Sequence, residues 1–516
     1  DALPSFALSI EPSDVEPIQT AAVTVAGRQG IKGRLTNTPT LILGVLVIGL
    51  AAVFLYVWLS NRQVESGKAS AVAAPVKSIA VLPFKTMSAE KDDEFLGLGV
   101  TDTLINSLSR TRQFVVRQMS AVLKYTDQDK DPLAAGSEQG VEAVLAGRIH
   151  RVGNRVRVTA QLVRVSDGAS LWADRFDEQY THIFAVEDAI AEKVALAMTR
   201  SLAAANKPIT TRPTDNSEAY QAYLKGQYFL SKRTGEGLKK GIESFEQAIA
   251  RDPNFAAAYA GLSDCLALLN IYDALPPRDA FEKARVAATT ALVLDDNLAE
   301  AHASLGLILM YHDWDWLTAE REYVRAIALN PDYPIVHQWR ALNLAAQGRL
   351  DEARTEIKRA QELDPPSLII NTNVGWIAYL SGQYDQAIDQ FKKTVELDPK
   401  FSRTRVRMGI VYAQKKMYPE AKAEFRQALN LSAGNPYALS LLGYASALSA
   451  DRAEAQRILT TLKAQSDQNR ITTFGIGLIY TGLGEPEQAL AWLEKALEQH
   501  PDSMIFLKVD PAFNSL

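Results

Sequence analysis

Histidine, cysteine and glycine are the residue types in this chain whose spacing could create a metal site, a nucleophile or a phosphate cradle. The six histidines show no i,i+4 pair and no cysteine partner, and Cys265 is alone, so no intramolecular disulfide can form. Gly97 and Gly99 precede a helical pattern, but the third glycine and the Lys-Ser/Thr pair of a phosphate loop are missing. Neither paired carboxylates on strands nor a serine elbow occurs. The residues therefore predict a non-enzyme with no catalytic residue, no metal and no cofactor.

Length and composition indicate a globular protein of several domains. The chain has 516 residues, 47% of them hydrophobic and 22% charged, with a net charge of -5. This balance does not predict a broad nucleic-acid surface. The first residue is Asp1 and not methionine, from which we expect that further sequence precedes it.

The carboxyl-terminal half of the chain carries a repeat of 34 residues. An alanine recurs at this interval, and we call these residues the marker alanines. A bulky apolar residue follows each of them after four positions, which places small and large side chains on one helix face. Prolines such as Pro331 follow the alanine by twelve residues and end the helix, because proline has no amide donor. Glycines such as Gly375 precede it by twelve and let a second helix approach closely. Each unit is predicted to be an antiparallel helix pair, and the marker residues are Ala319, Ala353, Ala387, Ala421, Ala455 and Ala489.

This pattern resembles the tetratricopeptide repeat (TPR). Eight units fit residues 217–501, and the first carries Gly241, Phe245, Ala248 and Pro253 at matching positions. The resemblance implies an all-α superhelix whose first helices line a concave face that holds a protein or peptide partner.

Aromatic and polar side chains fall on or beside that concave face when the chain is placed on the family register. Aromatic and arginine anchors are typical of peptide grooves. The paired Lys and Asn with which chaperone-binding relatives hold a terminal carboxylate are missing, so an acidic C-terminal tail is not the predicted partner. The partner-binding candidates are Trp376, Tyr379, Arg403, Gln414, Tyr437, Tyr444 and Phe474.

The amino-terminal part contains one long apolar run. Residues 1–40 are predicted as a linker, 41–60 as a transmembrane helix and 61–75 as a tether. Leu41–Leu59 has nineteen uncharged residues, a helix of about 28 Å. A cleaved signal peptide is disfavoured by the forty residues before the run, and a buried soluble helix by its lack of a polar face. The slight basic excess before it predicts a bacterial inner-membrane protein with a cytoplasmic amino terminus and periplasmic carboxyl-terminal domains.

An α+β domain is predicted over residues 76–205. A buried strand spans Ser78–Phe84, and period-two alternation around Val156 and Leu162, between turns at Gly153 and Gly168, predicts an antiparallel meander. The runs IAVLPF and LAGRIHRVGNRVRVTAQLVRVSDGASLWADRFD resemble the TolB amino-terminal-like domain. In relatives this domain and TPRs accompany a CadC-like winged helix, a nucleotide cyclase or a kinase, none of which residues 1–40 contain.

The predicted fold class is therefore multidomain, with one transmembrane helix, an α+β TolB-like domain, an all-α TPR superhelix and a C-terminal segment, 502–516. The leading functional hypothesis is a membrane-anchored, non-catalytic signalling or interaction scaffold, with the lipid bilayer and a peptide as partners. The alternatives are the sensory portion of a larger effector, a transcriptional regulator or cyclase whose output domain lies upstream of Asp1, and a structural subunit of an envelope complex.

Overall fold

The computed structural model describes residues 76–87, 95–110, 115–126, 130–153, 155–179, 183–201, 213–271, 277–432, 435–465, 470–498 and 502–513. All of them belong to the second of the two compact units into which the chain divides, residues 75–516. The linker, apolar run and tether predicted over residues 1–75 lie outside the described residues.

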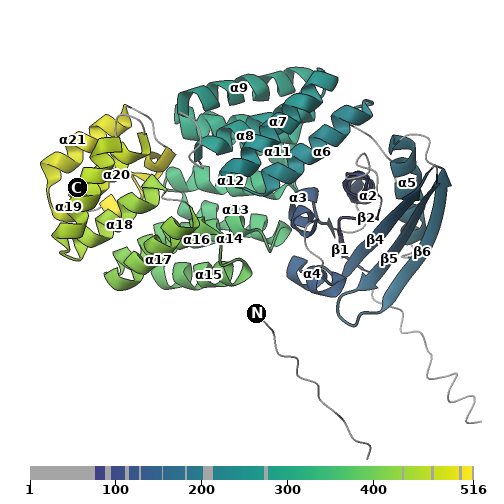
Figure 1. Ribbon diagram of the computed structural model, residues 1–516, viewed down its shortest axis with the longest axis horizontal. Helices are drawn as coiled ribbons and strands as arrows, with labels where there is room; N and C mark the ends of the chain where they lie inside the picture. Colours follow the sequence, from purple (N-terminus) through teal and green to yellow (C-terminus); the bar gives the residue numbers. More distant parts are fainter. Residues whose placement is uncertain are drawn as a thin grey trace, which may run out of the picture. The chain divides into compact units, whose positions relative to one another are not determined.

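A six-stranded mixed sheet forms the amino-terminal part of this unit (Figure 1). Its strands run in the order β3-β1-β4-β5-β6, and β2 also pairs with β4. In β5 buried and exposed residues alternate, as period-two patterning requires when one face covers a core. The strands are β1 (Ser78–Val81), β2 (Lys85–Met87), β3 (Val115–Val116), β4 (Ala143–Val152), β5 (Arg155–Arg164) and β6 (Ser170–Gln179).

Parallel and antiparallel pairing divide the sheet. Strand β1 is parallel to β3 and β4, while β4, β5 and β6 form the antiparallel meander predicted from the alternation. Helices α2 and α5 lie against the sheet (Figure 1). Their buried apolar residues belong to the same core cluster as those of the strands. The helices of this region are α2 (Leu96–Arg110), α3 (Met119–Val122), η2 (Leu123–Tyr125), α4 (Pro132–Gln139) and α5 (Ile183–Ser201).

Helices α6 to α21 follow as consecutive pairs that stack into the TPR array (Figure 1). A π-helical turn, η3 (Leu309–Asp313), extends α10. The pairs are α6 (Ser217–Ser231) with α7 (Gly235–Arg251), α8 (Ala256–Ile271) with α9 (Pro277–Leu294), α10 (Ala299–Ile308) with α11 (Trp316–Leu329), α12 (Pro334–Ala346) with α13 (Leu350–Leu363), α14 (Leu368–Leu380) with α15 (Tyr384–Leu397), α16 (Ser402–Gln414) with α17 (Tyr418–Leu431), α18 (Pro436–Leu448) with α19 (Arg452–Gln465), and α20 (Arg470–Leu483) with α21 (Pro486–Leu497).

Small residues at the repeat positions let the two helices of a unit pack closely. All six marker alanines are fully buried. The Phe391 ring lies over Gly375, where an added Cβ would stand 2.4 Å from a ring carbon, and Phe425 lies over Gly409 in the same way. Because each glycine packs directly against an aromatic ring, a larger residue in place of the glycine would cause strain. A smaller residue in place of the ring would leave a void.

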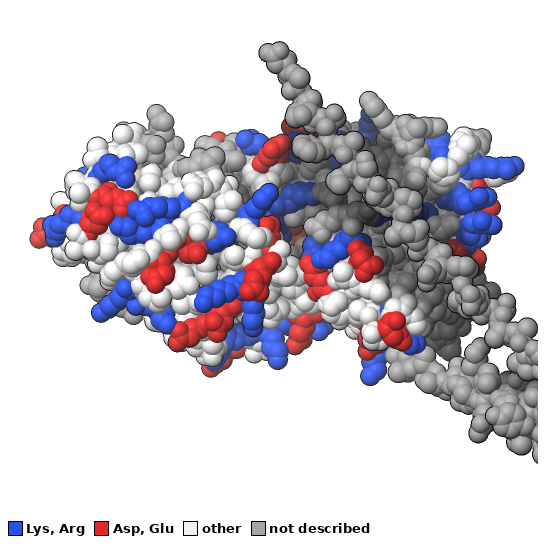
Figure 2. Space-filling model, turned by 60° about the horizontal axis from the view of Figure 1, so that its bottom comes forward, with Lys and Arg blue, Asp and Glu red and all other residues white. Residues whose placement is uncertain are grey.

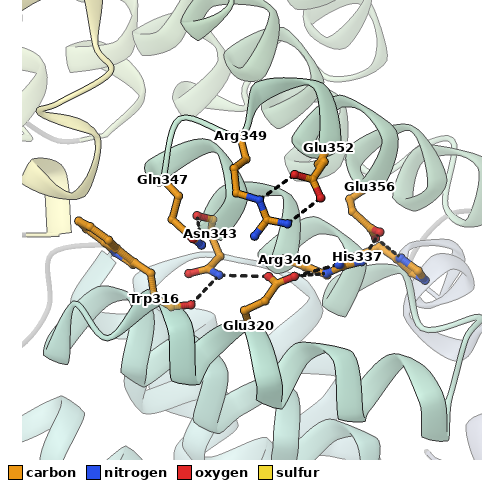
Figure 3. A network of polar contacts seen from close by, with 9 residues as sticks. All are labelled: Trp316, Glu320, His337, Arg340, Asn343, Gln347, Arg349, Glu352 and Glu356. Carbon is orange, nitrogen blue, oxygen red and sulfur yellow. Dashed lines mark hydrogen bonds and ion pairs between the residues drawn. The ribbon is translucent and has the colours of Figure 1, made fainter.

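Figure 3 shows polar side chains that connect α11, α12 and α13 across the boundary between two units. His337 of α12 contacts the Glu356 carboxylate of α13 and the Pro331 carbonyl, at 2.7 and 3.0 Å. Arg340 bridges Glu320 of α11 and Glu356. The same position in neighbouring units also contacts the carbonyl six residues earlier, through His302, Asn371 and Arg405. These contacts fix α10, α12, α14 and α16 against the connection that precedes each of them.

The predicted transmembrane helix and the localisation drawn from it are corrected. Within the described ranges no helix is both long and apolar enough to cross a bilayer. The longest, α5, has 19 residues but carries Glu187, Asp188, Glu192 and Lys193, and the repeat helices are shorter. The fold class becomes a TPR superhelix preceded by a small sheet region. A single-pass inner-membrane protein with a bilayer partner is not retained.

Candidate partner-binding groove

A cavity of about 1110 Å³ follows the first helices of the repeat units, and we refer to it as the groove. Residues from α6, α8, α10, α12, α14, α16, α18 and α20 line it. Helices α2 and α3 of the sheet region and the C-terminal segment contribute further residues. A cavity of this size can accept several side chains of a bound segment.

Five of the seven residues predicted as partner-binding candidates line this groove. Tyr379 and Gln414 do not: Tyr379 is fully buried, and Gln414 hydrogen-bonds the side chain of Tyr444. The Nε1 atom of buried Trp376 has no hydrogen-bond partner in the described part of the chain. The residues that do line the groove are Trp376, Arg403, Tyr437, Tyr444 and Phe474.

The C-terminal segment, residues 502–513, folds against the wall of the groove. It consists of two short 3₁₀ turns, η4 (Asp502–Phe506) and η5 (Pro511–Phe513). Phe506 meets Trp376 edge-on and Phe513 packs on Phe474, each with ring centroids 5.9 Å apart. The Tyr379 hydroxyl donates to the Asp510 carboxylate, whose pKa is raised by burial. The chain thus places its own aromatic–acidic–aromatic segment on the predicted peptide surface.

Arg407 is one of the lining residues that the sequence reasoning missed. Its guanidinium carbon lies 3.4 Å from the centroid of the Trp376 ring, a close cation–π stack. Burial lowers the pKa of Arg407 to about 10, and the like charge of Arg403 acts in the same direction. Helical spacing was the available signal, because Arg407 stands one turn after the predicted Arg403.

Carboxyl groups line another part of the groove. Asp264 accepts a hydrogen bond from Ser304 at 2.5 Å, and burial raises the pKa of Asp264 to about 7. Burial also raises the pKa of Glu300 above its ordinary value. In the described residues, these groups and their neighbours form no cluster of three or more metal-binding side chains. The lining of the groove therefore contains carboxyl groups whose pKa is raised as well as the arginine side chains of Arg403 and Arg407.

The sheet region is held to the repeats by side chains near the groove. Asp102 of α2 accepts a hydrogen bond from the Tyr220 hydroxyl of α6 at 2.6 Å, and burial raises the pKa of this carboxyl. Arg117 donates to the carbonyls of Glu362 and Leu363 at 2.7 and 3.0 Å, and to Gln139 at 3.0 Å. Arg117 thereby satisfies carbonyls at the end of α13 that have no intrahelical partner.

Family comparisons match both regions. Residues 315–367, 378–443 and 474–503 match models of the tetratricopeptide repeat. The chain contains tetratricopeptide repeats. Residues 75–193 match the second domain of HilA/YgeH-like transcriptional regulators. The predicted TolB-like identity of this segment finds no support, and the HilA-like match takes its place.

Two curated bacterial proteins are similar over much of the chain. A putative adenylate cyclase 3 of Rhizobium meliloti is 29% identical over 45% of this chain and 40% of its own length. The transcriptional regulator HilA of Salmonella typhimurium is 24% identical over 62% of this chain and 56% of its own. The chain thus spans about half the length of the curated relatives it matches. A solved structure of Pseudomonas aeruginosa PilF is 23% identical and covers 43% of this chain and 96% of its own, with a TM-score of 0.33.

Proposed function

We propose that this chain is the non-catalytic, partner-binding part of a bacterial regulatory protein, and that the groove binds a segment of another protein. The groove carries this proposal, because it is lined by aromatic and arginine side chains on the face that TPRs use for peptides. Figure 2 shows Lys and Arg side chains intermixed with Asp and Glu side chains on one face of the molecule. Ion pairs such as Arg359–Asp332 and Arg426–Glu454 also join neighbouring parts of the repeats. A mixed surface favours a protein partner over a polyanion.

The sensory portion of a larger effector is the form of this function that the relatives favour. The sheet region matches a domain of HilA/YgeH-like regulators and the repeats match tetratricopeptide models, while the similarity covers only part of a putative adenylate cyclase and of a transcriptional regulator. We infer that the groove receives a signal which an output domain converts into cyclase activity or transcription. Reading the gene on the 5′ side of the codon for Asp1 tests this: a winged helix or a cyclase domain supports it, and a stop codon there contradicts it.

Replacing Tyr437 tests the groove itself. Tyr437 is half-buried at the start of α18 and lines the groove, so Tyr437→Ala removes an aromatic anchor with little loss of core packing. Peptides selected from a displayed random library should bind Tyr437→Ala about tenfold more weakly than the parent chain, measured by fluorescence anisotropy. Val293→Ala is the matched control, because Val293 lies on α9 with 86% of its surface exposed. Equal loss in both variants, or no peptide binding by the parent, contradicts the proposal.

A further inference from the structure

Arg407 presents unused hydrogen-bond donors to the groove. Its guanidinium stacks on Trp376, and in the part of the chain that the structure describes it makes no hydrogen bond and no ion pair. A guanidinium carries five N–H donors in a planar fork that matches a carboxylate. A partly desolvated cation without an acceptor is costly, so this position is one where a ligand can supply the missing oxygens.

Among the described residues, neighbouring groups act on this positive charge from a distance and none forms an ion pair with it. Arg403 and Lys400 line the same stretch of groove and have the same sign. Asp510 is the acidic group whose charge acts on Arg407, but its Oδ1 already accepts from the Tyr379 hydroxyl and from the Ala512 amide at 3.0 Å. The C-terminal segment therefore occupies the groove without satisfying the guanidinium.

The segment that the groove already holds indicates what chemistry suits its walls. Phe506 and Phe513 fill the aromatic contacts at Trp376 and Phe474, and Asp510 between them is held by a tyrosine hydroxyl. This wall thus holds a short segment through aromatic anchors and one carboxylate. The groove is also lined by Tyr437 and Tyr444 of α18, a helix that contacts α16, the helix of Arg407.

We propose that the partner is an acidic peptide segment whose carboxylate pairs with Arg407 while its apolar side chains lie along Tyr437 and Tyr444. This inference rests on the proposed function and specifies the ligand of the same groove. Stacking on Trp376 fixes the plane of the guanidinium, so that a carboxylate can bind with two parallel N–H···O contacts. A chain of phosphates fits less well than a segment with one carboxylate, because Lys400, Arg403 and Arg407 come from α16 and the turn before it, whereas α2, α8 and α10 present Asp102, Asp264 and Glu300 to the groove.

Peptide selection on the intact chain tests this ligand class. A displayed library of random peptides is selected against the parent chain, and we expect Asp and Glu to be enriched among the binders. The tightest peptide should lose roughly ten- to hundredfold in affinity when its acid is changed to the amide, and a similar factor on Arg407→Gln. The two changes together should cost little more than either alone, because they remove the same pair. Arg452→Gln, an exposed change on α19, should leave the affinity unchanged.

Different outcomes separate the failure of this inference from the failure of the proposed function. Binders without acidic enrichment that bind Arg407→Gln and the parent equally overturn the carboxylate pair while the peptide groove stands. An oligonucleotide that displaces the selected peptide and loses its own affinity on Arg407→Gln overturns it in favour of a polyanion. No binder at all removes the proposed function itself. If Arg407→Gln lowers the unfolding midpoint, the acid-to-amide change in the peptide decides the test on the unaltered chain.

Discussion

Two parts of the chain outside the repeats pack against them, each through a hydrogen bond between a tyrosine hydroxyl and an aspartate carboxylate. The surroundings of these two hydrogen bonds differ. Asp102 meets Tyr220 where the sheet region contacts α6, and Asp510 meets Tyr379 where the C-terminal segment contacts α14. Both carboxyls have a pKa raised by burial. The first is carried by a helix of 15 residues, whereas the second lies between two 3₁₀ turns of five and three residues.

The difference lies in what supports each hydrogen bond. Arg117 adds contacts to the carbonyls at the end of α13, so the sheet region is attached at two places. The C-terminal segment depends on Asp510, two aromatic contacts and the buried side chains of Met504 and Ile505. Short segments with few contacts open at lower free energy than supported elements. We therefore expect the contact between the sheet region and the repeats to break only on global unfolding. The contact of the C-terminal segment should instead open locally, beside the groove.

Removing Arg117 should break this comparison most strongly. Arg117→Ala leaves the carbonyls of Glu362 and Leu363 buried without a donor, and we expect the free energy of unfolding to fall by about 3 kcal/mol. Chemical denaturation followed by circular dichroism measures this. Arg157→Ala is the control, because Arg157 pairs with Asp177 on the exposed face of the meander. An unchanged midpoint for Arg117→Ala would show that the sheet region folds independently of the repeats.

A matched pair of tyrosine changes sharpens the comparison. Tyr220→Phe and Tyr379→Phe each remove one hydroxyl that donates to a buried aspartate, a loss of about 1 kcal/mol. Tyr220→Phe should lower the midpoint of global unfolding. Tyr379→Phe should instead speed hydrogen exchange of residues 507–513 by roughly fivefold, with little change in that midpoint. Equal effects of the two variants on global unfolding would contradict the distinction.

The pH dependence of stability also distinguishes the two carboxyls. Because burial raises the folded pKa of Asp102 and Asp510, the folded state binds more protons than the unfolded state from about pH 4 up to each raised pKa. Stability should therefore fall as the pH rises through that window, by at most about 1.4 kcal/mol per pH unit and group. Asp102→Asn should reduce the pH dependence of the free energy of global unfolding. Asp510→Asn should reduce only the pH dependence of hydrogen exchange in the C-terminal segment. A global slope that changes equally in both variants would be the contrary result.

Local spacing made the repeats and the meander predictable. The alanines at 34-residue intervals, the glycine under Phe391 and the prolines after most of the second helices specify contacts within one turn or one helix pair. The alternation of buried and exposed residues around Val156 predicted the strands of the meander, because residues two apart lie on the same face of a sheet. The predicted set of groove residues followed from this register, and five of its members line the cavity.

The remainder of the site depends on contacts that local spacing does not encode. Tyr379 was predicted to face a partner, yet its hydroxyl is used by Asp510, 131 residues away. Arg117 reaches a carbonyl 246 residues later. A helix pattern shows which face is apolar, but it does not show which distant segment will cover a given polar group.

The sequence by itself determined the elements of this protein and the order in which they stack, because one-turn contacts recur in every unit. Only the tertiary structure decided that residues 502–513 cover part of the concave wall and that Arg407 lies on Trp376 facing an open cavity. The reason is physical. A periodic sequence specifies neighbours, whereas the filling of a groove depends on where the superhelix brings together residues far apart in the chain.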